Sequence, residues 1–292
     1  MPELPDLEAY RTALQPRIGG ATLRGVRLGN PFVLRTVTPR PDVLAGRAVH
    51  SIRRLGKRLA LGLDGDYWLI VHLMVAGRLQ WLAVDAKIPK KLGLLALDFA
   101  SGTLLLTEAG TKRRAAVHIV DSEAALKAHD PGGVEPLTAS VAEYAVQLRR
   151  KNQTLKRALT DPRAFSGIGN AYSDEILHRA GLSPLLTTAR LDDAAVLALR
   201  GAAVAVLGAW RDRLGAEAAA AWPHRVTAFR PEMAVHGKFG QPCPQCAAPV
   251  QRIVYADNEC NYCARCQTGG RLLADRALSR LLKDLWPKTL DE

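Results

Sequence analysis

All five cysteines of the chain lie in one short stretch, and they limit how that stretch can fold. Cys243 and Cys246 form one Cys-x-x-Cys pair, and Cys263 and Cys266 form a second. Each pair lets two thiolates reach one ion, and four thiolates at such spacing are typical of a tetrahedral structural Zn²⁺ site. The run from Pro249 to Tyr255 between the pairs is typical of one arm of a β-hairpin. We therefore expect one structural zinc ion per chain, with no open coordination position for catalysis.

Cys260 leaves a second ligand set open, because Cys260 and Cys263 also form a Cys-x-x-Cys pair. The outer pairs are symmetric, which favours Cys266 as the fourth ligand and leaves Cys260 outside the site. The alternative ligand set is Cys243, Cys246, Cys260 and Cys263. In a reducing cytosol, clustered cysteines favour a metal over disulfides, and we expect a cytoplasmic protein.

The remainder of the chain is basic. Its 292 residues are 48% hydrophobic, and 40 lysines and arginines against 28 acids give a net charge of +12 and a pI of about 9.8. This length is enough for two domains with cores of their own, and the charge indicates a polyanionic partner. We expect no membrane span, because no stretch approaches about 18 uninterrupted apolar residues. We also expect no secretory signal, because no basic region precedes an apolar run at the N-terminus.

The first eight residues, Met1-Pro2-Glu3-Leu4-Pro5-Asp6-Leu7-Glu8, precede an apolar pattern with helical spacing at Leu7, Tyr10 and Leu14. Pro5 is suited to the first turn of a helix, where the missing N–H has no consequence. Carboxylates in the first turn are favoured by the positive end of the helix dipole. One interpretation of this segment is therefore helix capping alone.

A second interpretation concerns Pro2. A small residue after Met1 usually allows Met1 to be removed, which would leave a secondary amine as the chain terminus. An α-amino group has a pKa of roughly 7.7–8.0, against about 10.4 for lysine, so much more of it is unprotonated near neutral pH. Attack of a secondary amine on an aldehyde carbon gives a cationic iminium, which is a strong electron sink. Glu3 is placed to transfer protons.

The region from about residue 21 to 120 has a pattern of short strands. Apolar runs at 68–74, 92–98 and 102–107 are bounded by turn signals such as Asp64-Gly65-Asp66. Many short strands at close spacing favour a β-sandwich or barrel. The basic cluster at 53–58 enters one of these strands, and it is either a solvated strand end or a phosphate contact.

Helical patterns follow from about Ser122. The run 141–158 is helical with an interruption at 149–152, and further helices are expected at 171–180 and 192–219. The sequence Phe165-Ser-Gly-Ile-Gly-Asn170 is a glycine-rich turn that leads into the helix at 171–180. Such a turn presents free backbone N–H groups that suit a phosphate, and we expect Asn170 to cap the helix.

Taken together, these motifs resemble those of the formamidopyrimidine-DNA glycosylase and endonuclease VIII family of bifunctional base-excision repair enzymes. The resemblance covers roughly residues 1–268. It implies a multidomain α+β fold with an N-terminal β-sandwich, a helix–two-turns–helix (H2TH) domain and a zinc finger on a β-hairpin, with DNA in the cleft between domains. The expected segments are 1–122 for the sandwich, 123–232 for the H2TH domain, 233–268 for the finger and 269–292 for a helical extension.

The resemblance also implies roles for single residues. Pro2 is similar to the Schiff-base nucleophile that attacks C1′ of the damaged nucleotide, and Glu3 to the acid/base that acts on the opening sugar. Asp6 stands where the family often has glutamate. The expected partner is damaged DNA, bound by a monomer that is associated with the nucleoid in the cytoplasm. The residues expected to contact DNA are Lys57, which also belongs to the catalytic set, Asn170, Lys156, Arg113 and Arg114.

Several positions depart from the family pattern. Asn258 stands five residues before Cys263, where the family has a phosphate-binding arginine, so that contact is absent or is made by Arg252 or Arg265. The formamidopyrimidine branch of the family continues Gly-Met after the strand that corresponds to 71–74 and so offers a methionine that fills the gap left by a flipped base, whereas this chain reads Leu73-Met-Val-Ala-Gly77. The Arg-Phe pair that serves the same purpose is replaced by the basic, non-aromatic segment 111–115. The stretch 267–276 and the basic helix expected to continue it to Lys283 extend beyond the usual end of the formamidopyrimidine branch, either packed on the finger or as a further DNA contact.

Two functions fit these observations. The first is a DNA glycosylase with lyase activity, which the Pro2 and Glu3 pair favours. The alternative is a DNA-damage or abasic-site binding protein on the same scaffold without base excision, which the departures at Asn258 and in 111–115 favour.

Overall fold

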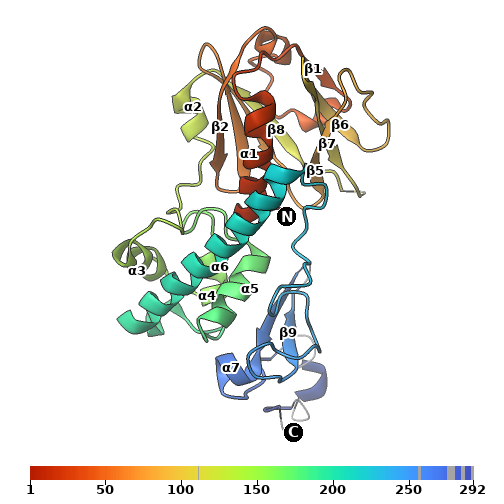
Figure 1. Ribbon diagram of the computed structural model, residues 1–292. Helices are drawn as coiled ribbons and strands as arrows, with labels where there is room; N and C mark the ends of the chain where they lie inside the picture. The colour runs from red at the N-terminus through yellow and green to blue at the C-terminus, as the bar shows by residue number, and fades with distance from the viewer. Residues whose placement is uncertain (111, 256–257, 275–279, 284–286, 291–292) are drawn as a thin grey trace. The chain divides into compact units, whose positions relative to one another are not determined.

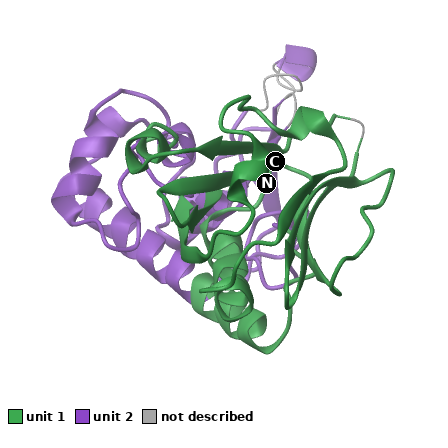
Figure 2. Ribbon diagram, turned by 90° about the horizontal axis from the view of Figure 1, so that it is seen from above, with its two compact units in different colours: residues 1–131, 210–227 green, residues 132–209, 228–292 purple. Residues whose placement is uncertain are grey.

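A computed structural model describes residues 1–290 of the chain except 111, 256–257, 275–279 and 284–286. The chain forms two compact units (Figure 2). Unit 1 comprises residues 1–131 and 210–227, and unit 2 comprises residues 132–209 and 228–292. Each unit contains residues that pack together, and the boundaries of the units therefore differ from those of the segments expected from the sequence. In particular, one long helix contributes its first part to unit 2 and its last part to unit 1.

Unit 1 contains two antiparallel sheets of four strands each, which confirms the predicted β-sandwich (Figure 1). The first sheet has the order β1-β6-β7-β5, and the second has the order β2-β3-β4-β8. The strands of the first sheet are β1 (Gly25–Leu28), β6 (Gly93–Phe99), β7 (Gly102–Glu108) and β5 (Gly77–Leu82). The strands of the second sheet are β2 (Val49–Leu55), β3 (Arg58–Leu63), β4 (Tyr67–His72) and β8 (Ala116–Val120).

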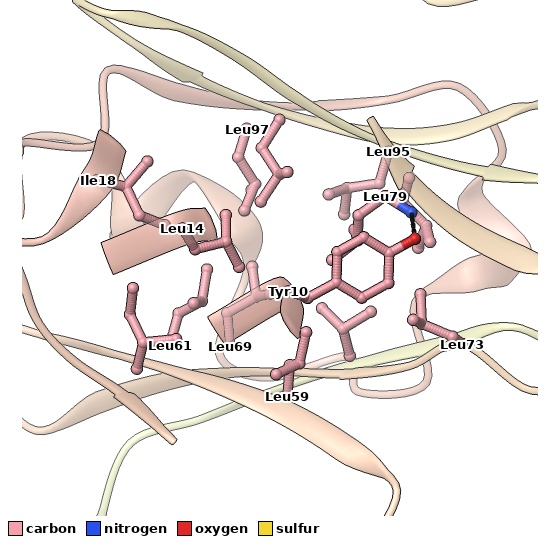
Figure 3. Close-up of a cluster of buried hydrophobic side chains, with 14 of the residues drawn as sticks. Tyr10, Leu14, Ile18, Leu59, Leu61, Leu69, Leu73, Leu79, Leu95 and Leu97 are labelled. Atoms are coloured by element: carbon pink, nitrogen blue, oxygen red, sulfur yellow. Dashed lines mark hydrogen bonds between the residues drawn. The ribbon is translucent and has the colours of Figure 1, made fainter. Parts of the chain in front are cut away.

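The core of unit 1 forms around helix α1 (Leu4–Ile18). Its residues Tyr10, Leu14 and Ile18 are fully buried and recur at the spacing of one helix face. In Figure 3 these three side chains lie between leucines of the two sheets, namely Leu79, Leu95 and Leu97 on one side and Leu59, Leu61 and Leu69 on the other. Burial of each such side chain contributes roughly 1.5–3 kcal/mol. The helix thus belongs to the interior of the sandwich, and this places the N-terminus of the chain at the end of the core.

Two polar contacts to strand β5 fix the core. The Tyr10 hydroxyl accepts a hydrogen bond from the Leu79 N–H at 3.2 Å (Figure 3). Trp222, from the later segment of unit 1, donates its indole N–H to the Leu79 carbonyl at 3.1 Å. Trp222 packs on Tyr10 with 5.8 Å between ring centroids. Residues 210–227 therefore complete the first core, although they are distant in sequence.

Short elements link the strands of unit 1. They are the 3₁₀ turns η1 (Pro31–Val33) and η2 (Pro41–Leu44) and helix α2 (Glu123–Lys127), whose N-cap is Ser122 as the helical onset near that residue predicted. A second, smaller apolar cluster lies on the outer face of sheet β2-β3-β4-β8. It comprises Ala60, Trp68, Ile70, Val120 and Leu126.

Unit 2 begins with helices whose boundaries follow capping signals. Ser140 caps α3 (Val141–Arg149) and Thr154 caps α4 (Leu155–Thr160), so the predicted interruption of this run is confirmed. Helix α5 (Asn170–Arg179) follows the glycine-rich turn. The unit continues with η3 (Thr188–Arg190), the first part of α6 (Asp193–Ala220), the hairpin strands β9 (Val250–Val254) and β10 (Glu259–Cys263), and α7 (Ala264–Thr268).

Helix α6 is long and apolar enough, by length and composition, to cross a membrane. One such helix is weak evidence for a membrane span, because the core helix of a soluble protein has the same composition. In α6 the apolar residues that face the cores of the two units are fully or almost fully buried. They are Val196, Leu199, Ala203 and Leu207 in unit 2, and Leu214 and Ala218 in unit 1.

The described parts of the C-terminal extension pack on the hairpin. Arg271 and Thr289 form an antiparallel bridge, and the Leu273 N–H donates to the Tyr262 hydroxyl at 2.7 Å. Leu273 and Leu290 contact an apolar cluster that includes Ile253. These contacts agree with a segment that is packed on the finger. The basic helix predicted to continue to Lys283 falls partly on residues 275–279, which lie outside the described residues.

Candidate active site and nucleic-acid interface

The start of the chain is held by local hydrogen bonding. Pro2 is buried and Glu3 is only 3% exposed. The Glu3 N–H donates to Asp6 Oδ2 at 3.0 Å, so Asp6 satisfies a backbone donor at the first turn of α1. Pro5 occupies the first turn of the helix, as predicted. The capping interpretation of the N-terminal segment is therefore confirmed, and the same contacts hold Pro2 and Glu3 in one position.

The electrostatic surroundings of the chain terminus favour a neutral amine. The terminal amine belongs to Met1, one residue before the Pro2 nitrogen that would become terminal after Met1 is removed. Burial lowers the pKa of this amine, and the cations Arg78 and Lys57 lower it further, whereas Glu3 and Asp6 raise it. Two cations and two carboxylates thus act on the position where a nucleophilic amine is expected. Lys57 is one of the predicted site residues, and Arg78 was not identified from the sequence.

Lys57 lies in the two-residue turn that joins β2 to β3, where Leu55 pairs with Arg58. Gly56 has a φ of +56°, which the tight turn requires and which favours glycine. Arg54 holds this turn, because its Nη1 donates to the Gly56 carbonyl at 3.0 Å. The largely buried Arg54 side chain also forms an ion pair with Glu8 of α1, with 2.9 Å between Nε and Oε1. This pair links the turn with Lys57 to helix α1, which begins near the chain terminus.

The basic cluster at 53–58 therefore divides into residues with different surroundings. Arg53 forms an ion pair with Glu123 at 2.8 Å. Its guanidinium carbon also lies 4.4 Å from the centroid of the Trp68 ring, which is a cation–π contact. Arg54 is an internal link, as described above. Sequence patterns alone do not separate such residues, because their partners come from distant parts of the chain.

Arg78 has structural partners in the loop between β4 and β5. Its Nη1 donates to the carbonyls of Val75 and Gly77, at 3.0 and 2.7 Å. Met74 has a φ of +53°, and a Cβ on Gly77 would lie 2.2 Å from the Leu73 carbonyl oxygen, so the loop is tight and requires glycine there. Val75 is 65% exposed in this loop. The exposed apolar side chain of Val75 therefore lies in the segment where the family has a methionine.

Arg113 and Arg114 follow strand β7. The buried Glu108 carboxylate accepts the N–H groups of Arg114 and Ala115, both at 3.0 Å, and so holds the backbone of this basic loop. Both arginines are exposed, and the Arg113 guanidinium donates to the Lys91 carbonyl. Thr111, the first residue of the basic segment considered above, lies outside the described residues.

Helix α5 provides the second group of predicted residues. Its N-cap is Gly169 in an extended conformation, and Asn170 is the first helical residue. The expectation that Asn170 caps the helix is therefore wrong by one position. The reason is tertiary, because the Asn170 side chain turns toward the hairpin and its Nδ2 donates to the Glu259 carbonyl at 2.9 Å.

Lys156 is an internal residue in this structure, with only 8% of its surface exposed. Its Nζ donates to Asp174 Oδ1 at 2.6 Å and to the Asn170 carbonyl at 2.7 Å. A buried ammonium requires such a partner, because desolvation of an unpaired charge costs several kcal/mol. Lys156 thus holds the first turn of α5, where the sequence predicted a direct DNA contact.

Polar side chains along one face of α5 join the helix to the cysteine-bearing segment. Asp174 accepts from Lys156, from the Cys260 thiol at 3.2 Å, and contacts His236 Nδ1 at 2.8 Å. One turn further on, His178 Nε2 lies 3.3 Å from Cys243 Sγ. Asn170, Asp174 and His178 recur at intervals of four, so they share one helix face. That periodicity was visible in the sequence, but the partners were not.

Glu175 also attaches α5 to the segment before the first cysteine pair. Its carboxylate accepts three successive backbone N–H groups, from Ala234, Val235 and His236, at 2.7, 2.9 and 2.9 Å. Three charge-assisted hydrogen bonds to one buried carboxylate form a strong anchor. The segment before the first Cys-x-x-Cys pair is thereby attached to α5.

Four cysteines form a group that could hold a metal ion. The sulfur atoms of Cys243, Cys246, Cys263 and Cys266 all lie within 4.8 Å of one another. The Cys246 and Cys263 sulfurs are 3.4 Å apart, and those of Cys243 and Cys266 are 3.9 Å apart. A tetrahedral ion with metal–sulfur bonds of about 2.3 Å needs sulfurs at about this spacing, so the residues present fit such an ion.

Cys260 does not belong to this group of described residues. It is fully buried in β10, and its thiol donates to Asp174. Burial and the Asp174 carboxylate raise the pKa of the Cys260 thiol well above its ordinary value. The outer pairs of cysteines are therefore confirmed as the clustered set, and the alternative set with Cys260 is excluded.

The hairpin also shows what stands in place of the family's arginine. The Asn258 carbonyl accepts from the Tyr255 N–H at 2.7 Å and so helps to close the hairpin. Arg252 stacks over Phe239, with 4.2 Å from the guanidinium carbon to the ring centroid, and its Nη1 lies 3.5 Å from a Glu259 oxygen. Arg265 is exposed. Arg252 thus contacts Phe239 and Glu259, and both candidate substitutes are exposed.

Comparisons with known proteins agree with this arrangement. The family profile of the formamidopyrimidine-DNA glycosylase N-terminal domain matches residues 1–121, and that of the H2TH domain of the same enzymes matches residues 133–210. The chain is 32% identical over 282 residues to the formamidopyrimidine-DNA glycosylase of Heliobacterium modesticaldum, which covers 91% of this chain and 100% of that protein.

Two further relatives are informative. The chain is 41% identical over 152 residues to an uncharacterized formamidopyrimidine-DNA glycosylase-like protein of Mycobacterium tuberculosis, which covers 52% of this chain and 94% of that protein. Its fold is similar to that of a Lactococcus lactis Fpg variant in complex with Fapy-dG-containing DNA, with a TM-score of 0.80, 26% identity, and coverage of 91% and 100% of the two chains. The chain therefore belongs to the formamidopyrimidine-DNA glycosylase family.

Proposed function

We propose that this protein excises a damaged base from DNA and then cleaves the strand, through a Schiff base formed by Pro2. The observation that carries the proposal is the environment of the chain terminus. Burial and two nearby cations lower the pKa of the terminal amine, and Glu3 lies beside it. A neutral amine next to a carboxylate is the arrangement that nucleophilic attack with proton transfer requires.

The chemistry begins after Met1 is removed. The Pro2 nitrogen attacks C1′ of the damaged nucleotide, and the bond from C1′ to the base breaks as the base takes the electron pair and a proton. The proton of the Pro2 nitrogen passes to Glu3 and from there to O4′, as the C1′–O4′ bond opens and the iminium forms. Loss of a C2′ proton then expels the 3′ phosphate, and a second elimination expels the 5′ phosphate.

The cations near the terminus have complementary roles in this proposal. Lys57, on the rigid β2–β3 turn, contacts a phosphate of the damaged nucleotide and orients C1′ toward the amine. Burial is the main cause of the lowered pKa of the terminal amine, and Arg78, which is held by the carbonyls of Val75 and Gly77, adds to it. Asn170 and the N-terminus of α5 contact the backbone elsewhere. Arg113 and Arg114, which are exposed, add charge for binding by a monomer.

We further propose that the four clustered cysteines bind one structural Zn²⁺ ion. Four thiolates and no open position suit zinc in a structural role. The ion would stabilise the turn regions that carry the two Cys-x-x-Cys pairs. Contacts of α5 with Cys243 and with the segment 234–236 would then hold the hairpin in place for DNA binding.

Borohydride trapping tests the main proposal. The full-length protein, with removal of Met1 confirmed by mass spectrometry, is incubated with duplexes that carry an oxidised purine, an oxidised pyrimidine or an abasic site. Reduction of the iminium should give a stable protein–DNA adduct, and digestion should place the link at Pro2. Failure to trap any of these substrates, with tight binding retained, would overturn the proposal.

That outcome would favour the alternative, a DNA-damage or abasic-site binding protein without base excision. The observations behind this alternative are the neutral Asn258 and the basic, non-aromatic Arg113 and Arg114. Pro2 and Glu3 would then serve helix capping alone. Base excision and trapping separate the two functions, whereas DNA affinity does not.

A further inference from the structure

We propose that unit 1 carries an additional phosphate-binding site, formed by Arg58, His118 and His129, and that its ligand is a backbone phosphate of the bound DNA. This inference rests on the proposed function, because it takes DNA as the partner. The site lies on the outer face of sheet β2-β3-β4-β8, next to the turn that carries Lys57.

The register of the sheet brings these side chains together. Arg58 of β3 pairs with His72 of β4, and His118 of β8 pairs with Ile70. Directly paired residues share a face, and so do residues two apart on one strand, so Arg58, His72 and His118 lie on the same face. His129 follows α2 and contacts His118, with 4.5 Å between ring centroids. The His129 carbonyl accepts a hydrogen bond from Arg58 Nη1 at 2.8 Å, which holds the segment after α2 on strand β3.

Arg58 offers a donor that the described part of the chain does not use. Its Nε is buried and has no hydrogen-bond partner there. Buried donors are nearly always paired, and an unpaired one costs roughly 1–3 kcal/mol. The guanidinium is fixed through Nη1, and no described residue supplies an acceptor at Nε. Arg58, His118 and His129 are all half-buried, so a small anion can reach them.

The charges around the site are predominantly positive. Arg58 and Lys57 act on His72, whereas Arg58 and Arg35 act on His118. The acid that acts on Arg58 is Asp130, which is exposed. Together with burial, these cations lower the pKa of all three histidines, and that of His72 to about 4. An anion bound there would relieve the repulsion and allow the histidines to take up protons.

Continuity with Lys57 points to DNA as the source of the phosphate. Lys57 directly precedes Arg58, and its charge acts both on the chain terminus and on His72. Phosphates follow one another along a strand at about 3.4 Å of helix axis each. A strand that places one phosphate at Lys57 can therefore place a neighbouring one at Arg58 and His118. A site for free phosphate would not need to adjoin the Lys57 turn.

The first test uses inorganic phosphate and the full-length protein. Histidine ring signals are followed by NMR over pH, with and without phosphate. Phosphate should raise the titration midpoints of His118 and His129 by about one unit, as a close opposite charge does. Arg58→Gln should remove the response. His50→Gln is the matched control, since His50 is exposed and its ring packs on Trp68. No response in the wild type would overturn the proposal.

The second test uses DNA. The salt dependence of binding to a duplex with a stable abasic-site analogue is measured for the wild type and for Arg58→Gln, His118→Gln and His50→Gln. Each variant that loses a phosphate contact should lower the slope of log K against log salt by about 0.9, alike on damaged and undamaged duplexes. Variants at two positions are used because one of them could fold incorrectly. Thermal melting of each variant checks that it is folded.

The two tests together distinguish free phosphate from a DNA backbone phosphate as the ligand of the site. A phosphate response in NMR with unchanged salt slopes would mean a site for free phosphate alone and would overturn the assignment to DNA. Lower slopes for Arg58→Gln and His118→Gln, but not for His50→Gln, would support it. Borohydride trapping by the wild type is a separate measurement. Its failure would defeat the Schiff-base proposal and leave the slope comparison intact.

Discussion

The Cys260 thiol donates a hydrogen bond to Asp174, with 3.2 Å between Sγ and Oδ1, although Cys260 lies only three positions before a clustered cysteine. In an antiparallel hairpin, successive residues alternate in direction, and Cys260 faces α5 while Cys263 reaches the other cysteines. Strand alternation therefore directs Cys260 to a buried carboxylate and away from the four clustered cysteines.

The first prediction concerns this choice. Cys260→Ser should keep one zinc per chain and full DNA affinity, because serine can also donate to Asp174. Cys243→Ser, Cys246→Ser, Cys263→Ser or Cys266→Ser should lose zinc and DNA affinity together, since zinc contributes about 10–16 kcal/mol in isolated finger peptides. The main thermal transition should change little, because the other cores do not include these cysteines. Metal analysis and calorimetry check this, and zinc loss by Cys260→Ser alone would contradict it.

The second prediction concerns the terminal amine. Pro2→Gln should retain Met1, because a large side chain after methionine blocks its removal, and it should lose borohydride trapping at least 100-fold, or about 2.7 kcal/mol in rate. DNA affinity should remain close to that of the wild type, since it comes from the basic surface. Intact-mass spectrometry and gel trapping are the measurements. Trapping at the wild-type level by protein with Met1 present would rule out Pro2 as the nucleophile.

The third prediction concerns Lys57. Lys57→Ala should lower the slope of log K against log salt by about 0.9 and weaken binding to all sequences alike. The turn itself should persist, because Gly56 and the Arg54 contact to its carbonyl are unchanged. Fluorescence anisotropy over a range of salt concentrations tests this. An unchanged slope would show that Lys57 has only a structural role in the turn.

The fourth prediction concerns the buried pair of Lys156 and Asp174. Asp174→Asn should destabilise unit 2 by about 3–5 kcal/mol, because it leaves a buried ammonium without its counter-charge. Asp193→Asn is the matched control. It removes an ion pair with Arg149 whose two side chains are exposed, and it should cost at most about 1 kcal/mol. Chemical denaturation followed by circular dichroism measures both, and equal effects would count against the role assigned to Asp174.

The fifth prediction concerns stability against pH. Burial first, then the charges of Arg58 and Lys57, lower the pKa of His72 to about 4 in the folded state, from 6.5. As the pH decreases, His72 of the unfolded chain therefore binds its proton before His72 of the folded chain does. The free energy of unfolding falls between pH 6.5 and about 4, and the contribution of His72 to it does not change further below about pH 4. His118 and His129 act in the same direction.

The corresponding experiment compares unfolding free energies of the wild type, His72→Gln and His50→Gln across this range. The difference between wild type and His72→Gln should change between pH 6.5 and 4, and His50→Gln should follow the wild type. Parallel curves for all three proteins would show that His72 is not the group responsible.

Local patterns in the sequence determined much of this protein. The turn at Asp64-Gly65-Asp66, the interruption between α3 and α4, the helix that follows Gly169 and the spacing of the cysteine pairs were all readable. Each depends on residues close in the chain, through propensity, capping or the reach of a Cys-x-x-Cys turn. The capping of the first turn of α1 was also anticipated, because Glu3 and Asp6 lie within that turn.

Tertiary structure decided the roles of residues whose partners are far away in sequence. Lys156 and Arg54 had the appearance of surface cations, yet Asp174 and Glu8 draw them inward into ion pairs. Asn170 is turned from a helix cap to a contact with β10. Arg58, His118 and His129 meet only through the register of three strands and a returning loop. The sequence determines which side chains are charged. Whether a charged side chain is buried, paired or accessible to a ligand depends on which segments pack on it in the folded protein.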